Sequence, residues 1–172
     1  MLNNNMKKGI IISGFAGIGK TELGKKYSNI IDLESTSYHW IFNDDTIEKQ
    51  DYEKKKGIND RVMNPSWPYN YIDCIIDAKS KYDIILITAS KEIRLLLEKN
   101  DINFIFAFPS IDCKKDIIER YKNRNNNEKF INGALDAFDN WSKELNTYKY
   151  PVMIIKKEQY LEDVLKEVGI LM

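Results

Sequence analysis

One run of eight residues has the composition and spacing needed to hold a chain of phosphates. It matches the pattern G-x-x-x-x-G-K-[ST] and consists of Gly14, Phe15, Ala16, Gly17, Ile18, Gly19, Lys20 and Thr21. The glycines allow the backbone to curl so that its N–H groups point inward at phosphate oxygens. Lys20 can reach the β- and γ-phosphates, and the Thr21 hydroxyl can ligate Mg²⁺. We therefore predict that all eight residues bind ATP, that Lys20 is catalytic and that Thr21 is a metal ligand; a glycine-rich turn with a surface lysine is the alternative.

Two carboxylates follow the next short apolar segment. Asp32 and Glu34 are two residues apart, so their side chains share a side if the backbone stays extended. One can order Mg²⁺ and its waters or accept a proton from an attacking hydroxyl, and the other can bind polar groups of a substrate. We predict Asp32 as a catalytic residue and metal ligand, and Glu34 as a substrate-binding residue. Two ordinary loop acids, or a helix cap, are the alternative.

Arginine is scarce, since the chain has 26 basic residues of which four are arginine. A planar guanidinium binds phosphate in a two-point geometry that lysine cannot copy, so each arginine is a candidate for the site. Arg120 and Arg124 are spaced i, i+4 and share one face of a predicted helix, and we predict that both are catalytic, neutralising the transferring phosphoryl group. Arg61 and Arg94 are predicted to bind substrate. The alternative for each is an exposed ion pair worth at most about 1 kcal/mol.

The elements that would hold these residues alternate between apolar runs and helical patterns. Short β-branched or aromatic runs predict strands at residues 9–13, 29–33, 82–88, 103–108 and 150–155. Apolar residues at helical spacing predict helices at residues 20–27, 69–79, 91–99, 112–122, 130–145 and 161–168. The alternation implies an α/β fold, with a five-stranded, mostly parallel sheet and helices on both faces. The glycine-rich run and the two acids then lie at the carboxyl edge of the sheet, where ligands bind.

Two segments depart from this alternation. Residues 35–66 are polar, charged and aromatic with weak periodicity, and we predict a substrate-covering insertion there. Its rings, and those just after it, can stack on a nucleobase or form a small satellite core. His39, the only histidine, is more typical of a packing residue than of a base. Residues 120–130 run into an asparagine-rich stretch and are predicted to form a short lid.

Composition argues against several classes of function. Acidic and basic residues number 26 each, so the net charge is zero and bulk nucleic-acid binding is not expected. No apolar stretch approaches the roughly 18 residues needed to cross a membrane. Cys74 and Cys113 lack metal-binding spacing and are typical of thiols in a reducing cytosol, so the expected location is cytoplasmic. We expect a single domain of 172 residues, acting as a monomer or homodimer.

The sequence resembles the nucleoside-monophosphate kinase and shikimate/gluconate kinase superfamily of P-loop proteins. GFAGIGKTELGKKY followed by IIDLES is similar to the opening of those proteins. TASKEIRLLLEKNDINFIFAFPS followed by IIERYKNR is similar to their third strand, helix, fourth strand and lid, so the likeness covers residues 8–168. It implies the strand order 2-3-1-4-5 and a short lid whose arginines clamp the transferring group. The D-G-x-P-R element of adenylate kinases is absent, so the resemblance does not identify the acceptor.

The expected function is transfer of the γ-phosphate of ATP to a small acceptor. A nucleoside monophosphate is the favoured acceptor, because aromatic residues and arginines in the insertion suit a base and a phosphate. A kinase of a hydroxyl acceptor (a sugar acid, a nucleoside or a polynucleotide end) is one alternative, and a nucleotide-binding module without turnover is another. A motor or switch is disfavoured, because the run at 82–88 leads into Thr88-Ala89-Ser90 with no acid for Mg²⁺.

Overall fold

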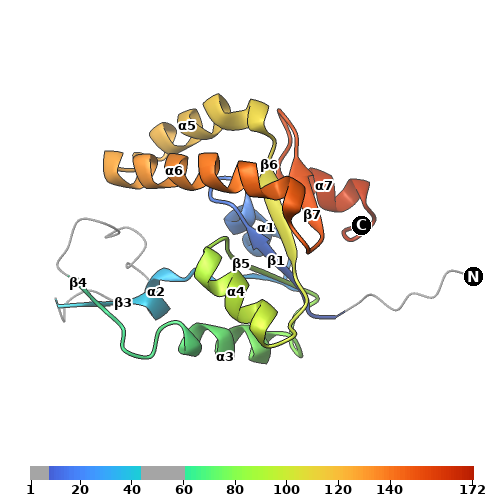
Figure 1. Ribbon diagram of the computed structural model, residues 1–172. Coiled ribbons are helices and arrows are strands. Elements are labelled where there is room, and N and C mark those ends of the chain that lie inside the picture. The colour runs from blue at the N-terminus through green and yellow to red at the C-terminus, as the bar shows by residue number, and fades with distance from the viewer. Residues whose placement is uncertain (1–7, 44–60) are drawn as a thin grey trace, which may run out of the picture.

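The computed structural model describes residues 8–43 and 61–172. Its central feature is a five-stranded parallel sheet in the order β2-β5-β1-β6-β7 (Figure 1). The strands are β1 (Ile10–Gly14), β2 (Ile30–Asp32), β5 (Ile84–Thr88), β6 (Ile105–Pro109) and β7 (Val152–Ile155). The three inner strands are almost continuously buried, which is why the sequence shows them as unbroken apolar runs rather than as alternating patterns.

Helices fill the connections between these strands. They are α1 (Lys20–Lys26), α2 (Thr36–His39), α3 (Tyr69–Ala78), α4 (Lys91–Lys99), α5 (Lys114–Asn123), α6 (Glu128–Glu144) and α7 (Leu161–Glu167). Short 3₁₀ turns at Ile111–Cys113 and Leu145–Thr147 precede α5 and follow α6. In Figure 1, α3 and α4 lie together on one side of the molecule and α5 and α6 on the opposite side, with β1 and α1 between the two pairs.

Two strands that the sequence analysis did not predict change the strand numbering. β3 (Trp40–Phe42) and β4 (Arg61–Met63) pair antiparallel in a separate two-stranded sheet. Counted along the chain, the main sheet therefore has the order 2-5-1-6-7 instead of the expected 2-3-1-4-5. Strands of three residues are too short to show an alternation that can be recognised in a sequence. Both belong to the predicted insertion at 35–66, of which residues 44–60 lie outside the described part of the chain.

Strand register brings the predicted site residues to one edge of the sheet. Gly14 is aligned with Thr88 across β1 and β5, and Asp32 is aligned with Leu86 across β2 and β5. The buried Ser13 hydroxyl donates a hydrogen bond to the Thr88 carbonyl at 2.9 Å, which ties the ends of β1 and β5 together. The carboxyl ends of β1, β2 and β5 therefore form one platform.

The predicted lid at residues 120–130 consists of the end of α5, a turn and the start of α6. Asn125 in the turn has a φ of 54°, a left-handed conformation that asparagine tolerates. The Asn127 side chain accepts a hydrogen bond from the Phe130 N–H at 2.8 Å and so caps α6. Within the two described stretches, no helix is both long and apolar enough to span a membrane.

Candidate active site

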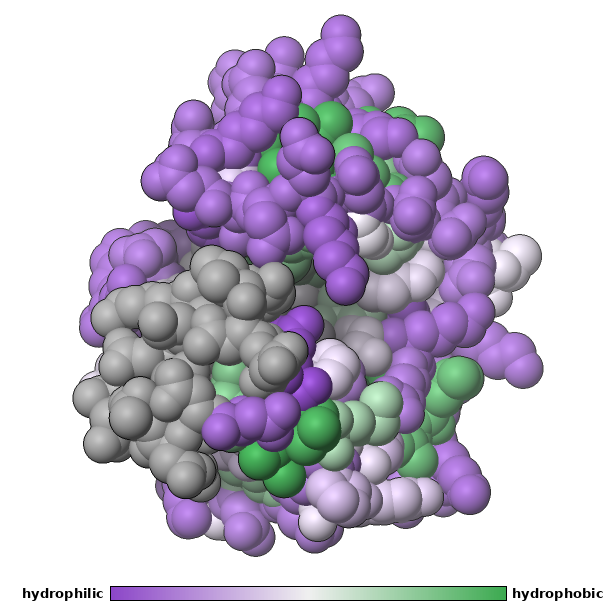
Figure 2. All heavy atoms as spheres, turned by 90° about the vertical axis from the view of Figure 1, so that its left-hand side faces the viewer, coloured by the Kyte–Doolittle hydropathy of each residue, from purple (hydrophilic) through white to green (hydrophobic). Residues whose placement is uncertain are grey.

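A cavity of about 700 Å³ lies over the carboxyl edge of the sheet. Its floor is the loop between β1 and α1, one wall follows β2 and β5, and the roof is formed by α5 and α6. Figure 2 faces this side of the molecule and shows a recess below the strongly hydrophilic upper part of the view. The wall is lined by Asp32, Leu33, Glu34, Ser35, His39, Thr88, Ala89 and Ser90, and the roof by Tyr121, Arg124, Asn126, Lys129, Phe130, Gly133, Ala134, Ala137 and Trp141.

The floor is the glycine-rich loop, and its backbone carbonyls are all turned toward donors of the protein. Lys20 Nζ donates to the Gly14 carbonyl at 2.7 Å and to the Phe15 carbonyl at 3.0 Å. The next four carbonyls accept from Tyr121 Oη, Arg120 Nη1, Leu161 N and Leu23 N, in chain order from Ala16 to Gly19. Six consecutive carbonyl groups are therefore satisfied by donors of the protein itself.

Four successive N–H groups of the same loop, unlike its carbonyls, lack hydrogen-bond partners among the described residues. Within the described residues, no hydrogen bond uses the backbone N–H groups of Ala16, Gly17, Ile18 or Gly19. Gly17 and Gly19 have φ values of 83° and 99°, which curl the loop in a way that other residues resist. A run of successive unpaired N–H groups beside a helix N-terminus is an anion-binding arrangement, because the partial positive charges add.

Lys20 lies over the mouth of this loop because Gly14 leaves room for its stem. A Cβ atom at position 14 would come within 2.9 Å of Lys20 Cδ, so a side chain there would displace the lysine. With its stem folded over Gly14, the Lys20 ammonium is held by the first two loop carbonyls next to the unpaired N–H groups. The loop therefore offers both backbone dipoles and a full positive charge to one anion.

Thr21 and Asp32 meet at the side of the floor. Thr21 Oγ1 donates to Asp32 Oδ2 at 2.9 Å, and both residues line the cavity. The contact depends on Gly24 in α1, where an added Cβ would lie 3.1 Å from Asp32 N and 3.2 Å from its Cβ. A hydroxyl and a carboxylate are oxygen ligands of the kind that Mg²⁺ prefers, completed in such sites by phosphate oxygens and water. In the described part of the chain, no cluster of three or more His, Cys, Asp and Glu side chains could hold a metal by itself.

Glu34 is held against the start of α2. Its Oε1 accepts hydrogen bonds from Thr36 Oγ1 at 2.8 Å and from Thr36 N at 3.3 Å. The helix-cap role that the sequence left open is therefore present in the geometry. Glu34 also lines the cavity, as Asp32 does.

Tyr71 fixes this wall, and from the sequence it was considered only as one of the rings in and just after the insertion. Its buried hydroxyl donates to the Leu33 carbonyl at 2.5 Å and accepts from the Thr88 N–H at 3.2 Å, which joins the ends of β2 and β5. Burial raises the pKa of Tyr71 well above its usual value, so the hydroxyl stays protonated and remains a donor. Sequence periodicity shows only that position 71 is on the apolar face of α3, and the polar function of its hydroxyl leaves no signal.

The two lid arginines have different positions. Arg124 lines the cavity, together with Lys129 from the start of α6. Arg120 is not among the lining residues, because its guanidinium braces the loop from behind through the Gly17 carbonyl at 3.0 Å and the Gln159 carbonyl at 3.4 Å. Its guanidinium carbon lies 4.1 Å from the centre of the Tyr160 ring. The structure thus brings Arg124 to the cavity and places Arg120 as a support of the floor.

Arg94 lies away from the cavity, in an aromatic cage. It is 2% exposed, and its guanidinium carbon lies 4.1 Å from the ring centre of Phe106, 4.8 Å from that of Trp141 and 5.2 Å from that of Tyr148. Arg94 Nε donates to the Ala89 carbonyl at 3.3 Å. The reason is its position in α4: the helix begins at Lys91, and the fourth residue faces the core beside Ile93 and Leu97 rather than the sheet edge.

Arg61 is also absent from the cavity lining. It lies on β4, and its guanidinium carbon is 4.1 Å from the centre of the Trp40 ring on β3. The tryptophan in turn stacks on His39, so the aromatic residues of this region pack on one another. The rings pack on one another, and Trp67 and Tyr71 belong to the main hydrophobic core rather than to a satellite one, while stacking on a nucleobase stays a prediction.

The roof was predicted only as a packed helix. Phe130, Gly133, Ala134, Ala137 and Trp141 recur at helical spacing along α6 and give the cavity a wall of small and aromatic side chains. Phe15 of the loop meets the Trp141 ring edge-on, with ring centres 5.8 Å apart.

No known protein family matches the chain by its sequence profile, and a search of curated proteins found no significant match.

Proposed function

We propose that this protein is an Mg²⁺- and ATP-dependent phosphotransferase whose acceptor is a hydroxyl group of a small molecule. The observation that carries the proposal is the divided backbone of the loop at residues 14–21. Its carbonyls from Gly14 to Gly19 are satisfied by protein donors, whereas the N–H groups of residues 16–19 have no partner within the described chain. This arrangement suits the phosphates of a nucleotide.

The side chains around the loop supply the remaining parts of such a reaction. Lys20 balances charge on the β- and γ-phosphates, and Arg124 approaches the same region from the roof. Thr21 and Asp32 would hold Mg²⁺, and the ion would supply positive charge to offset the charge that develops on the transferring group. The acceptor oxygen attacks the γ-phosphorus, the bond to the β,γ-bridging oxygen breaks, and the proton of the acceptor passes to a carboxylate of the wall.

The composition of the wall favours a hydroxyl over a phosphate as acceptor. Its polar side chains among the described residues are those of Asp32, Glu34, Ser35, His39, Thr88 and Ser90. The two arginines that supported a nucleoside monophosphate are engaged elsewhere, Arg94 in its aromatic cage and Arg61 on Trp40. A hydroxyl acceptor needs a base to receive its proton, and carboxylates near the metal provide one, whereas a phosphate acceptor needs none.

The experiment that tests the proposal measures ADP release from MgATP with two panels of acceptors. One panel contains sugars, sugar acids and nucleosides, and the other contains nucleoside monophosphates. We expect acceleration by at least one hydroxyl acceptor and none by the monophosphates. Acceleration by monophosphates alone would contradict the hydroxyl assignment, and tight MgATP binding with no transfer to any acceptor would contradict the assignment as a phosphotransferase.

A further inference from the structure

The peptide groups of the loop at residues 14–21 are oriented from behind. The peptide bonds of this loop are trans, so the carbonyl of one residue and the N–H of the next point in opposite directions. A donor that holds a carbonyl therefore sets the direction of the following N–H group. Each of the four N–H groups without a partner among the described residues, at positions 16–19, follows a carbonyl that the protein holds. Three of the four donors lie outside the loop, on α5 and at the start of α7.

Tyr121 holds the peptide group between Ala16 and Gly17. Its hydroxyl donates to the Ala16 carbonyl at 3.0 Å, so the Gly17 N–H points away from Tyr121. The buried ring packs directly against the loop, since a Cβ atom added at Gly17 would lie 3.1 Å from Tyr121 Cε1. Burial raises the pKa of Tyr121, so the hydroxyl stays protonated and can donate. The ring and the hydroxyl of Tyr121 together fix this one peptide plane.

Arg120 holds the next peptide group, between Gly17 and Ile18. Its Nη1 donates to the Gly17 carbonyl at 3.0 Å, so the Ile18 N–H points away from the guanidinium. The guanidinium is itself fixed, because Nη2 donates to the Gln159 carbonyl at 3.4 Å and the group lies over the Tyr160 ring. One turn of α5 therefore sets the direction of two successive N–H groups in the loop.

We propose that Tyr121 and Arg120 are positioning residues, which hold the loop so that the N–H groups of Gly17 and Ile18 face the bound phosphates. The inference rests on the proposed function for the identity of the anion as a nucleotide phosphate. It gives Arg120 a role other than neutralising the transferring group, because its guanidinium is bonded to two carbonyls behind the floor. N–H groups that are already oriented do not have to be ordered when the phosphates bind, so the two side chains strengthen nucleotide binding.

The sequence allows one of these peptide groups to be observed by itself. Gly17 is the only glycine of the chain that follows an alanine, and Gly19 is the only one that follows an isoleucine. Protein labelled with carbonyl-¹³C alanine and ¹⁵N glycine therefore gives a single carbonyl-selected amide signal, that of Gly17, and labelling with isoleucine instead gives that of Gly19. The carbonyl before Gly19 is held by the backbone N–H of Leu161, which a side-chain substitution does not remove. Gly19 is thus a reference within the same loop.

Tyr121→Phe keeps the ring and removes only the hydroxyl. We expect it to shift the Gly17 signal of the free protein while the Gly19 signal stays in place, and to weaken MgADP binding, measured by calorimetry, about three- to tenfold. Tyr148→Phe is the control, since it removes a half-buried hydroxyl that is not hydrogen-bonded to the loop, and it should keep the wild-type affinity. An unchanged Gly17 signal, an unchanged affinity in Tyr121→Phe, or an equal loss in Tyr148→Phe overturns the proposal.

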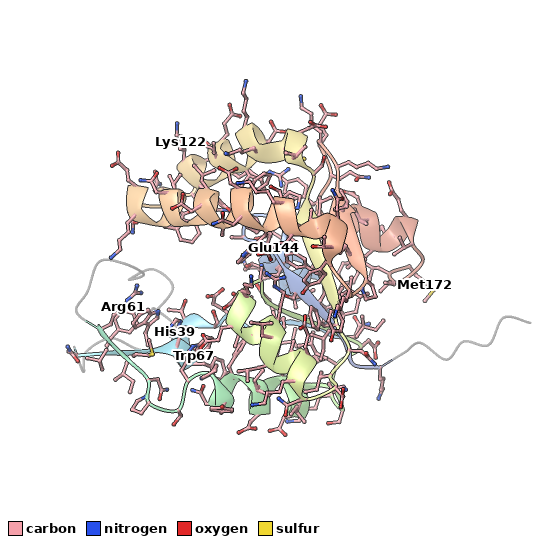
Figure 3. The ribbon with its side chains drawn as sticks, viewed as in Figure 1. His39, Arg61, Trp67, Lys122, Glu144 and Met172 are labelled. Atoms are coloured by element: carbon pink, nitrogen blue, oxygen red, sulfur yellow. The ribbon has the colours of Figure 1, made fainter. Side chains whose placement is uncertain are left out.

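A second variant separates positioning from direct action on the transferring group. Arg120→Met should weaken MgADP and a non-hydrolysable MgATP analogue by similar factors of at least about threefold, because backbone N–H groups of such loops bind phosphates that both nucleotides share. A clamp on the γ-phosphate would weaken the analogue alone. Lys122→Met removes an exposed charge that Figure 3 shows on the outer side of α5, and it is the control. Unchanged MgADP affinity in Arg120→Met, or equal losses in both variants, overturns the role of Arg120.

The proposed function and the positioning role fail in different ways. If the wild type binds neither nucleotide, the proposed function fails, and the positioning role fails with it. If the wild type binds both and transfers phosphate while Tyr121→Phe keeps the wild-type affinity, the phosphotransferase proposal stands and the positioning role is wrong. Should Arg120→Met fail to fold, the Gly17 signal and the MgADP affinity of Tyr121→Phe decide.

Discussion

The floor of the cavity and the wall along β2 and β5 are built on opposite principles. The floor is one contiguous run of residues, and the groups proposed to bind phosphate are its backbone N–H dipoles, in a curl set by glycine geometry. The wall is lined by residues of β2, α2 and β5 and of the segments that follow β2 and β5, and it is held by Tyr71 and by the stacking of His39 on Trp40 and Trp67. A site made of backbone groups depends on the local spacing of residues, so it can be predicted from a sequence. A wall made of side chains that are distant in the sequence can be described only from the structure.

The first way to test this comparison is to remove the one charged side chain of the floor. Lys20→Met should lower phosphotransfer at least about a hundredfold, because the lysine is the fixed positive charge at the loop mouth. Steady-state ADP release with the best acceptor measures the effect. Lys25→Met, five residues along in the same helix and bonded only to Glu22, is the control and should keep the wild-type rate. Comparable losses in both variants would assign the effect to α1 rather than to the loop.

The second test asks whether Arg94 stabilises the fold or binds the acceptor. Arg94→Ala should lower the free energy of unfolding by about 2–4 kcal/mol, because it empties a cage formed by Phe106, Trp141 and Tyr148. Arg94→Met should cost much less, since an apolar side chain of similar length refills the cage. Denaturant unfolding measures both values. If Arg94→Met is stable but loses affinity for the acceptor, Arg94 binds substrate, as the sequence alone predicted.

The third test loosens the wall and leaves the floor intact. Tyr71→Phe removes one hydroxyl and leaves the Leu33 carbonyl and the Thr88 N–H unpaired, at a cost of about 1–3 kcal/mol in unfolding free energy. We expect the KM for the acceptor to rise while the affinity for MgATP, measured by calorimetry, stays close to that of the wild type. Tyr69→Phe, an exposed tyrosine in the same helix, is the matched control and should change neither quantity. Equal losses of both affinities would show that floor and wall are not independent.

Sequence reasoning identified the five strands of the main sheet, and it located the loop and the two acids at the sheet's carboxyl edge, because each has a local signature. The isoleucine- and phenylalanine-rich runs correspond to β1, β5 and β6, and the spacing from Gly14 to Thr21 predicted which residues would form the floor. Asp32 was expected at the carboxyl edge because it directly follows an apolar run, and it lies there next to Thr21. In these segments, the residues that determine the local structure are neighbours in the sequence.

The remaining features depend on contacts between distant residues. The rotation of α4 about its axis decides whether Arg94 faces the cavity or the core. The scarcity of arginine in the sequence gives no information about that rotation. Arg120 lies within α5 and meets the Gly17 carbonyl, whereas Arg124 lies just past the last helical residue, Asn123, and lines the cavity. The stack of Trp40, His39 and Trp67 requires a hairpin and a turn to meet, and neither has a sequence pattern long enough to predict that meeting.

The smallest expected effect concerns a surface contact that supports the floor. Glu162 in α7 accepts hydrogen bonds from Lys26 Nζ at 2.6 Å and from Tyr27 Oη at 2.8 Å, and it pairs with Lys166 at 2.8 Å. These bonds, that to Lys166 foremost, lower the pKa of Glu162 from 4.5 to about 2. The neighbouring residue, Leu161, donates its N–H to the Ile18 carbonyl of the loop. The bonds of Glu162 to Lys26 and Tyr27 therefore support the floor by joining α7 to the end of α1.

A carboxylate whose pKa is lower in the folded state stabilises the fold above its unfolded pKa and loses that contribution as protons bind. Glu162→Gln should therefore lower the unfolding temperature slightly at pH 7, and the difference from the wild type should shrink as the pH falls from 4.5 to about 2. Thermal unfolding across this range measures it. Glu22→Gln, which removes a single exposed partner of Lys25, is the control and should show a smaller difference. A difference for Glu162→Gln that stayed constant down to pH 2 would mean that the ion pairs of Glu162 do not hold α7 against α1.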